Sequence, residues 1–233
     1  MRRAATGSLL FVSLLPVLGS RDAVAADDEV RTFAVKVDDK PAGEYKMTIG
    51  QRDSGTITMA AQAEISFQHH VVLTYTYSYR GSEVWKDGRL MRLDSTGNDD
   101  GKRFALTAVA NKDRLRVRVN GQDREARSDL WPTTYWRLAN AKYRNKAISL
   151  LDADTGKEID ASLNYIDKSD VNIAGRLQRC AHYRVSGGVQ VELWYDAADR
   201  LVRQESLEEG HRTVLELTSV RRQSRPLESA KRN

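Results

Sequence analysis

Apolar and polar residues alternate along most of the chain, and this alternation is its strongest pattern. Near the start, for example, Phe33, Val35 and Val37 are separated by polar or small side chains. Successive side chains of a strand point to opposite faces, so a period of two predicts strands with one face on a core and one in water. Similar runs return at even spacing, and we count about ten to twelve strands. The sequence therefore predicts an all-β fold, an antiparallel meander forming a strongly curved sheet or an open barrel.

Residues 73–95 form the clearest hairpin of this prediction. Asp87-Gly88 stands between two alternating runs, and Asp-Gly is a strong signal for a two-residue hairpin turn. In the preceding run, Ala61 and Ala63 leave room on the inner face of the sheet. On the first strand of the hairpin the aromatic residues share one face: Tyr75, Tyr77, Tyr79 and Trp85.

The segment 129–142 breaks the period of two. Pro132 near its start suits the first turn of a helix, and Trp131, Tyr135 and Leu138 follow a helical spacing of i, i+4 and i+7. We predict one short helix here, lying across the concave face of the sheet.

The N-terminal residues have the pattern of a secretory signal peptide. Arg2 and Arg3 precede a short apolar run, and Ala23-Val24-Ala25 supplies a small-x-small cleavage site. We expect a signal peptide at residues 1–25, a single β domain at 26–223 and a disordered C-terminal tail at 224–233. The expected location is the periplasm or the extracellular medium. Cys180 is the only cysteine, so an internal disulfide is impossible even in an oxidising compartment.

Charge says little about partners. The net charge is +5, but 37 basic and 32 acidic residues are interleaved nearly everywhere. Together with the predicted export, this argues against a nucleic-acid partner. Arg114, Arg116 and Arg118 share one side of a predicted strand, where they can face phosphate groups or form a solvated edge that discourages aggregation.

The common catalytic and cofactor motifs are absent, and we predict no cofactor and no metal site. The sequence has no Gly-x-Ser-x-Gly, no Gly-rich phosphate loop and no His-Glu-x-x-His pair. His69 and His70 are adjacent, so on a strand their rings point to opposite faces. Cys180 and His182 share a face, and a thiol beside a histidine can act as nucleophile and base, which leaves an enzyme as one hypothesis.

The aromatic residues are the best candidates for a binding site. Large rings dominate cores, so they can simply hold the fold together; alternatively, some of them line a cavity beneath the predicted helix. The predicted ligand-binding residues are Tyr75, Tyr77, Tyr79, Trp85, Trp131, Tyr135, Trp136 and Trp194.

Three strings of residues carry a family resemblance. At residues 79–90, 132–136 and 193–196 the chain resembles a family of exported proteobacterial proteins of unknown function. More distantly, the order of long strands with a covering helix is similar to the architecture of lipoprotein carriers of the LolA and LolB kind, which implies an unclosed barrel that shelters acyl chains. The resemblance assigns no activity to any residue.

Three hypotheses about function follow. The first is a periplasmic, non-enzymatic binding or carrier protein for a hydrophobic or amphipathic ligand such as a lipid, an acyl chain or an acylated protein. The second is a structural or interaction module of the cell envelope that binds no small ligand and contacts another protein or the membrane surface. The third is the enzyme based on Cys180 and His182.

Overall fold

The computed structural model describes residues 27–52, 55–70, 73–208 and 210–224. The expected signal peptide, residues 1–25, and the expected tail beyond residue 224 lie outside the described residues. The side chains of His69, His70 and Leu73 lie outside them as well.

Two meanders build one large sheet. The first consists of β1 (Asp28–Val37), β2 (Lys40–Gln51), β3 (Thr56–His70), β4 (Leu73–Lys86), β5 (Arg89–Asp99), β6 (Lys102–Asn111), β7 (Arg114–Val119) and β8 (Gln122–Arg127). The second consists of β9 (Trp131–Pro132), β10 (Lys146–Leu151), β11 (Glu158–Ile173), β12 (Arg176–Gly187), β13 (Val191–Tyr195), β14 (Leu201–Glu208) and β15 (His211–Gln223).

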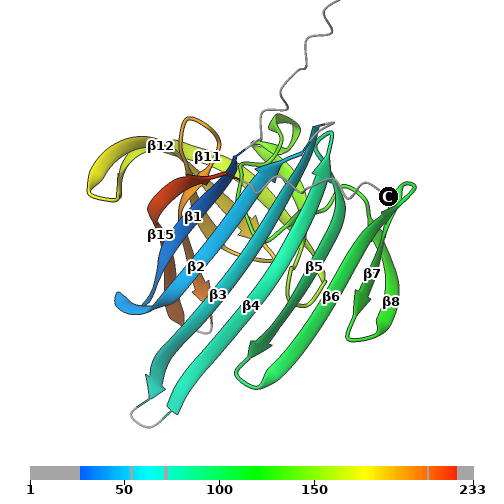
Figure 1. Cartoon of the computed structure of the whole chain (residues 1–233), viewed down its shortest axis with the longest axis horizontal. Coiled ribbons are helices and arrows are strands. Elements are labelled where there is room, and N and C mark those ends of the chain that lie inside the picture. The colour runs from blue at the N-terminus through cyan, green and yellow to red at the C-terminus, as the bar shows by residue number, and fades with distance from the viewer. Residues whose placement is uncertain (1–26, 53–54, 71–72, 209, 225–233) are drawn as a thin grey trace, which may run out of the picture.

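The two meanders join where the last strand meets the first. Within the described residues the sheet has 15 strands, in the order β8 to β1 followed by β15 to β9. β1 pairs with β15 in antiparallel fashion, and Ala34 lies opposite Glu216. In Figure 1, β1 to β6 lie side by side in one broad layer, and β15 continues this layer beside β1 before the sheet bends toward β12 and β11. The edge strands β8 and β9 do not pair with each other, so the curved sheet stays open.

The predicted antiparallel, strongly curved all-β sheet is confirmed, but the predicted strand number is too low. The missed strands have little alternation to reveal them. In β8, for example, Ala126 is the one buried residue of six, and β9 has only two residues. The Asp87-Gly88 turn is as expected: both residues have positive φ, at 51° and 75°, as a type I′ turn requires.

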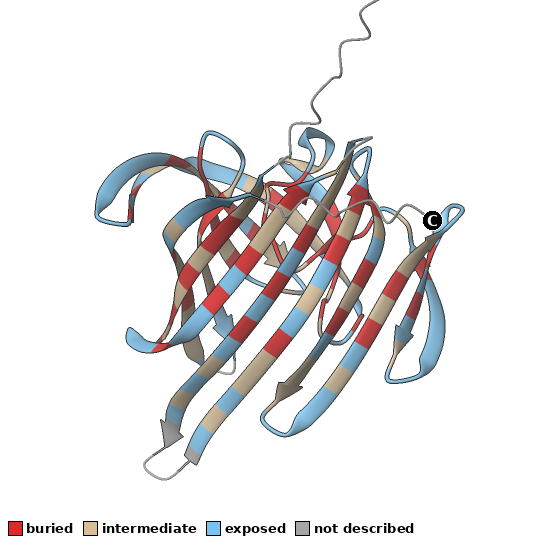
Figure 2. Cartoon of the chain, viewed as in Figure 1, coloured by how far each residue is buried: buried red, intermediate tan, exposed pale blue. Residues whose placement is uncertain are grey.

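Burial follows the strand period. Figure 2 shows buried positions alternating with more exposed ones along the strands of the first meander. The inner positions form one apolar cluster that contains side chains from both meanders, including Phe33, Met47, Leu93, Leu193 and Leu201. Because both meanders contribute, the apolar interior holds the two halves of the sheet together.

The predicted helix at 129–142 is wrong. Trp131 and Pro132 pair in parallel with Leu150 and Leu151, and the only helical turn in the described part of this region is the three-residue 3-10 helix η2 (Ala141–Tyr143). Tyr135 has a φ of +46°, which an α-helix does not allow. Hydrogen bonds to distant strands replace helical ones, so the aromatic spacing that suggested a helix serves tertiary contacts instead.

Residues 133–139, which we call the crossing segment, pass between the two halves of the sheet. Leu201 N–H and the buried Arg31 Nη1 both donate to the carbonyl of Trp136, at 3.4 and 2.6 Å. Tyr195 Oη donates to the carbonyl of Tyr135 at 3.1 Å. The crossing segment therefore occupies the place on the concave face where a helix was expected, but as extended and irregular chain.

Candidate functional site

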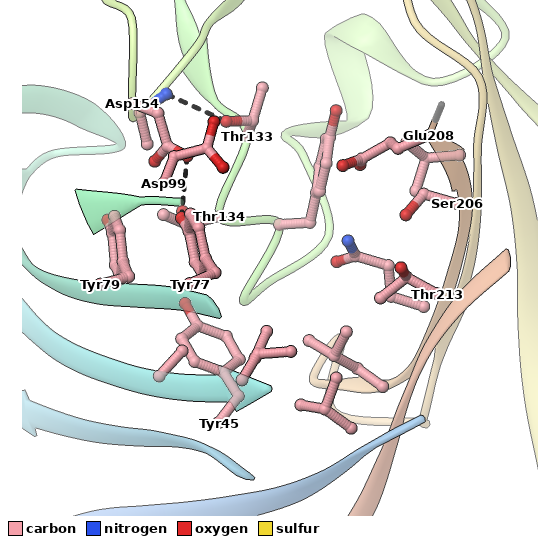
Figure 3. A pocket seen from close by; sticks show the side chains of 18 of the residues that line it. Tyr45, Tyr77, Tyr79, Asp99, Thr133, Thr134, Asp154, Ser206, Glu208 and Thr213 are labelled. Carbon is pink, nitrogen blue, oxygen red and sulfur yellow. Dashed lines mark hydrogen bonds between the residues drawn. The ribbon is translucent and has the colours of Figure 1, made fainter. Parts of the chain in front are cut away.

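A cavity of about 520 Å³ lies inside the curved sheet, next to the crossing segment. Its walls come from β1 to β4 on one side and from β13 to β15 on the other, and the crossing segment and the β10–β11 turn close one end. Figure 3 shows Tyr45, Tyr77 and Tyr79 on one side of this space, facing Ser206, Glu208 and Thr213 on the other.

Strand β4 supplies a row of tyrosines to the cavity. Tyr75, Tyr77 and Tyr79 all line it because alternate side chains of a strand share a face. Tyr79 is buried, with 5% of its surface exposed, whereas Tyr77 and Tyr75 are half-buried. Tyr45 on β2 adds a fourth ring, and Tyr135 of the crossing segment a fifth. The row becomes more exposed toward Tyr75, which indicates that the cavity opens in that direction.

The sheet also supplies an apolar surface. The small side chain of Ala63 stands between Tyr45 and Tyr79 in the sheet register, so the cavity extends over β3 at this point. The other apolar side chains that line the cavity from the strands are Val35, Val37, Ile65, Phe67, Ile159, Val191 and Leu215.

Four carboxylates line the same cavity. Asp99 ends β5, Asp152 and Asp154 lie in the β10–β11 turn, and Glu208 ends β14. Tyr75 Oη donates to Asp99 at 2.6 Å and Tyr77 Oη donates to Asp154 at 2.8 Å. Among the described lining residues there is no lysine, arginine or histidine.

Asp154 is the carboxylate most affected by its surroundings. Burial raises its pKa, and the neighbouring charges of Asp152, Asp99 and Glu208 raise it further, while the hydrogen bond from Tyr77 opposes them; the resulting pKa is about 6. Burial and the same carboxylate raise the pKa of Tyr77 well above its usual value, so its hydroxyl stays a donor.

The hydroxyl of Tyr135 has no hydrogen-bond partner among the described residues. The side chain is 4% exposed and lines the cavity. Burial and the charges of Asp152 and Glu208 raise the pKa of this phenol, so it is neutral and can donate or accept. A buried hydroxyl without a partner is costly, so this group is the polar atom of the cavity wall whose hydrogen bonding the protein itself leaves unmet.

The β10–β11 turn is held against the opposite half of the sheet. Ser95 on β5 donates its hydroxyl hydrogen to the carbonyl of Ala153. A Cβ atom on Gly156, whose φ is +69°, would lie 2.7 Å from Val119 and 2.8 Å from Leu106. This close approach fixes the turn on β6 and β7 and so positions Asp152 and Asp154.

A family model described as a domain of unknown function, DUF6134, matches residues 33–218. The chain belongs to this family. The resemblance to a family of unknown function is thereby confirmed, whereas export of the chain stays a prediction. No curated protein matches the chain.

Two solved structures align with most of this chain. A β-barrel-like protein of the domain of unknown function DUF1849 from Brucella abortus aligns over 86% of this chain and 99% of its own, with 9% identity and a TM-score of 0.63. This likeness shows a shared fold. A putative outer membrane lipoprotein-sorting protein domain from Vibrio parahaemolyticus aligns over 86% and 87%, with 10% identity and a TM-score of 0.27. The sequence was compared above with lipoprotein carriers of this kind, but a TM-score this low supports no conclusion about a shared fold or role.

Two of the three strings that carried the family resemblance, 79–90 and 132–136, meet at one buried carboxylate beside the crossing segment. Glu83 on β4 is 1% exposed and accepts hydrogen bonds from Trp85 Nε1, Thr134 Oγ1 and Trp136 Nε1 at 2.6, 2.5 and 2.9 Å. Burial raises the pKa of Glu83 and the three donors lower it, with a net rise. Glu83 thus anchors the crossing segment to β4 at the family strings 79–90 and 132–136.

Arg137 lies over the tryptophan rings of this cluster. Its guanidinium carbon is 4.3 Å from the ring centroid of Trp85, 5.1 Å from that of Trp131 and 4.9 Å from that of Trp136. Cation–π contacts of this kind stabilise a partly buried charge. These three tryptophans therefore hold the crossing segment in place and do not line the cavity.

The predicted binding residues thus divide into two groups. Four of them line the cavity: Tyr75, Tyr77, Tyr79 and Tyr135. Trp85, Trp131 and Trp136 pack around Arg137. Trp194 lies on the outer face, where its ring stacks on His182 with centroids 4.4 Å apart and the guanidinium carbon of Arg203 lies 5.5 Å from its centroid. That any of them binds a ligand stays a prediction.

Sequence reasoning missed Tyr45 and the four carboxylates. Tyr45 alternates with polar residues and shares a face with Met47, so its position on the inner face of the sheet could have been predicted. The carboxylates lie at strand ends or in a turn, where no periodicity shows which way they point.

Cys180 and His182 both lie on β12 but do not act on each other. The thiol is 1% exposed and donates to the carbonyl of Gln178 at 3.4 Å. His182 Nε2 contacts Glu192 at 2.7 Å. Burial, with smaller contributions from Asp196 and Asp170, raises the pKa of Cys180 to about 11, the opposite of an activated thiol.

The remaining predictions about chemistry concern metals, membranes and the arginine row. In the part of the chain that the structure describes, no three His, Cys, Asp or Glu residues group as metal ligands, and no helix there has the length and hydropathy to cross a membrane.

Arg116 and Arg118 pair with Asp123 of β8 at 3.0 and 2.8 Å, and Arg114 approaches Glu125 at 3.6 Å. The arginine row is an exposed, salt-bridged surface.

Proposed function

We propose that the protein is a non-enzymatic binding or carrier protein that holds a small hydrophobic or amphipathic molecule inside the curved sheet. The observation that carries this proposal is the cavity itself. Its volume of about 520 Å³ lies within the ~300 to 1,000 Å³ range that is common for ligand pockets.

The lining supports an amphipathic ligand in particular. Aliphatic side chains and tyrosine rings from the sheet provide the apolar surface, while four carboxylates together with threonine, serine and glutamine side chains provide the polar groups. This combination is typical of small-molecule sites, where apolar contact gives affinity and a few polar groups fix orientation.

The buried thiol argues against the enzyme hypothesis. Cys180 is buried in the apolar cluster and does not line the cavity, its pKa is raised, and its thiol donates to the carbonyl of Gln178 and not to His182. The predicted signal peptide supports a carrier that acts in the periplasm or outside the cell, where lipids and acylated proteins must be shielded from water.

Native mass spectrometry of protein purified gently from its own host tests the proposal. We expect a non-covalent small-molecule adduct that is released by organic extraction. Protein that is consistently empty and takes up no fluorescent fatty acid would contradict the proposal. A reproducible protein partner in crosslinked cells, together with an empty cavity, would favour an envelope interaction module instead.

A further inference from the structure

The charge of the cavity is opposite to that of the whole chain. The protein carries a net charge of +5, yet its cavity is lined by four carboxylates and, among the described residues, by no cationic side chain. Basic residues are abundant on the outer face, where Arg203, Arg212 and Lys36 all pair with Glu205 or Glu216. The acidic character is therefore a property of the cavity and not of the sequence as a whole.

Within the described chain no salt bridge joins a cationic side chain to these carboxylates, and His211, which lies opposite Glu208 in the sheet, pairs with Asp38. Asp99 and Asp154 each accept a hydrogen bond from a tyrosine of β4, and Asp152 accepts bonds from the backbone and hydroxyl of its own turn. Glu208 faces them from β14 across the cavity, as Figure 3 shows. Neutral hydrogen bonds leave the negative charges in place, and a cleft of low dielectric concentrates their field.

Aromatic faces and an unpartnered hydroxyl lie beside these carboxylates. Tyr45, Tyr77 and Tyr79 present rings to the cavity, and tyrosine faces attract cations through their quadrupole. The Tyr135 hydroxyl, buried and without a partner in the described residues, lies where Asp152 and Glu208 act on it electrostatically. An ammonium group can donate a hydrogen bond to this oxygen and satisfy it.

We propose that the cavity receives an amphipathic organic cation, with its ammonium head among Asp99, Asp154 and Glu208 and its apolar chain against the sheet. This inference rests on the proposed function and narrows the class of its ligand. Repulsion from the neighbouring carboxylates, which adds to the effect of burial on the pKa of Asp154, is relieved when the cation binds.

Isothermal titration calorimetry with three probes of equal chain length tests the inference. The probes are decylammonium, decanol and decyl sulfate, each kept below its micelle concentration at pH 8. We expect decylammonium to bind about tenfold or more tightly than decyl sulfate, with decanol between them. Asp154→Asn should weaken decylammonium binding about threefold to tenfold and leave decanol binding unchanged.

Tyr135→Phe and Glu64→Gln complete the design. Removing the unpartnered hydroxyl should weaken decylammonium binding about threefold to tenfold without loss of thermal stability, since no hydrogen bond within the protein is lost. Glu64 is exposed on β3 and does not line the cavity, so Glu64→Gln should change no affinity.

The possible failures are distinguishable. If decanol binds but decylammonium binds no better than decyl sulfate, the cation inference is overturned and the proposed carrier function stands. Equal weakening by Asp154→Asn and Glu64→Gln would show surface attraction and would also overturn the inference. If none of the three probes binds, both proposals fail.

Discussion

Tyr77 donates its phenolic hydrogen to Asp154 Oδ2 at 2.8 Å, from the middle of β4 to a turn 77 residues away in the sequence. The bond joins the first meander to the second across the hollow of the sheet. It keeps a carboxyl group in a partly buried position beside three other carboxylates, which is why the pKa of Asp154 is about 6. The bond thus links the tyrosine row of β4 to the carboxylates of the cavity.

Replacement of Asp154 by asparagine should stabilise the protein at alkaline pH. The folded-state pKa of about 6 lies above the ordinary aspartate value of 3.8, so the folded state binds the proton more tightly and wild-type stability falls as pH rises from about 4 to about 6. Asparagine retains an acceptor for Tyr77 and carries no charge. One pKa unit corresponds to about 1.4 kcal/mol, and water entering the cavity reduces the effect.

We therefore expect Asp154→Asn to raise the free energy of unfolding by about 1 to 2 kcal/mol at pH 8. The difference should shrink through pH 6 and vanish near pH 4. Urea unfolding followed by tryptophan fluorescence measures it. Parallel stability profiles of the two proteins between pH 4 and pH 8 would show that Asp154 is not perturbed as described.

Glu83 should be the most sensitive residue for stability. Glu83→Ala leaves the indole N–H groups of Trp85 and Trp136 without an acceptor and removes the negative charge nearest to Arg137. Two buried donors lose their acceptor and a buried charge loses its counter-charge, so the free energy of unfolding should fall by about 3 to 5 kcal/mol. Glu83→Gln keeps one acceptor oxygen and should lose less.

The matched control for this substitution is Glu64→Ala, an exposed position on the neighbouring strand β3. It should change the free energy of unfolding by about 0.5 kcal/mol or less in the same urea titration. Equal stability of the Glu83→Ala and Glu64→Ala proteins would refute the anchoring role of Glu83.

Cys180 should react slowly with thiol reagents in the folded protein. Its side chain is 1% exposed and its pKa is about 11, so both access and thiolate content are low at pH 8. We expect labelling by a disulfide reagent to be slow in buffer and rapid in concentrated urea. Rapid labelling of the native protein at pH 7 would revive the enzyme hypothesis.

The period of two was enough to predict the sheet, because nearly every strand buries one face. Phe33 and Val35, for example, alternate with outward side chains and lie in the core as expected. The pattern fails where tertiary hydrogen bonds decide the backbone. Trp131, Tyr135 and Leu138 have helical spacing, yet Trp131 pairs with Leu150, Leu138 N–H donates to the carbonyl of Asp199, and Tyr135 adopts a positive φ.

Only part of the candidate site could be predicted from the sequence, because strand periodicity gives the direction of a side chain within a strand but not in a turn or at a strand end. Tyr75, Tyr77 and Tyr79 line the cavity because strand parity fixes their direction. Asp154 and Glu208 lie at a turn and at a strand end, where direction depends on the fold of the complete sheet. Trp85 has the same parity as the tyrosines but lies farther along β4, where the crossing segment covers it.

The most direct test of the carrier proposal is to fill the cavity from within. Ala63 lines the cavity on β3, and Ala60 is exposed on the same strand. Each protein is titrated with the uncharged fluorophore N-phenyl-1-naphthylamine, and the affinity of Ala63→Trp is compared with that of the control Ala60→Trp. If Ala63→Trp fails to fold, Ile65→Trp serves as a second filling variant. We predict that the wild-type and Ala60→Trp proteins bind the probe equally and that the filling variant binds about tenfold more weakly or worse. Undiminished binding by a folded filling variant, or no binding by the wild-type protein, would contradict the account.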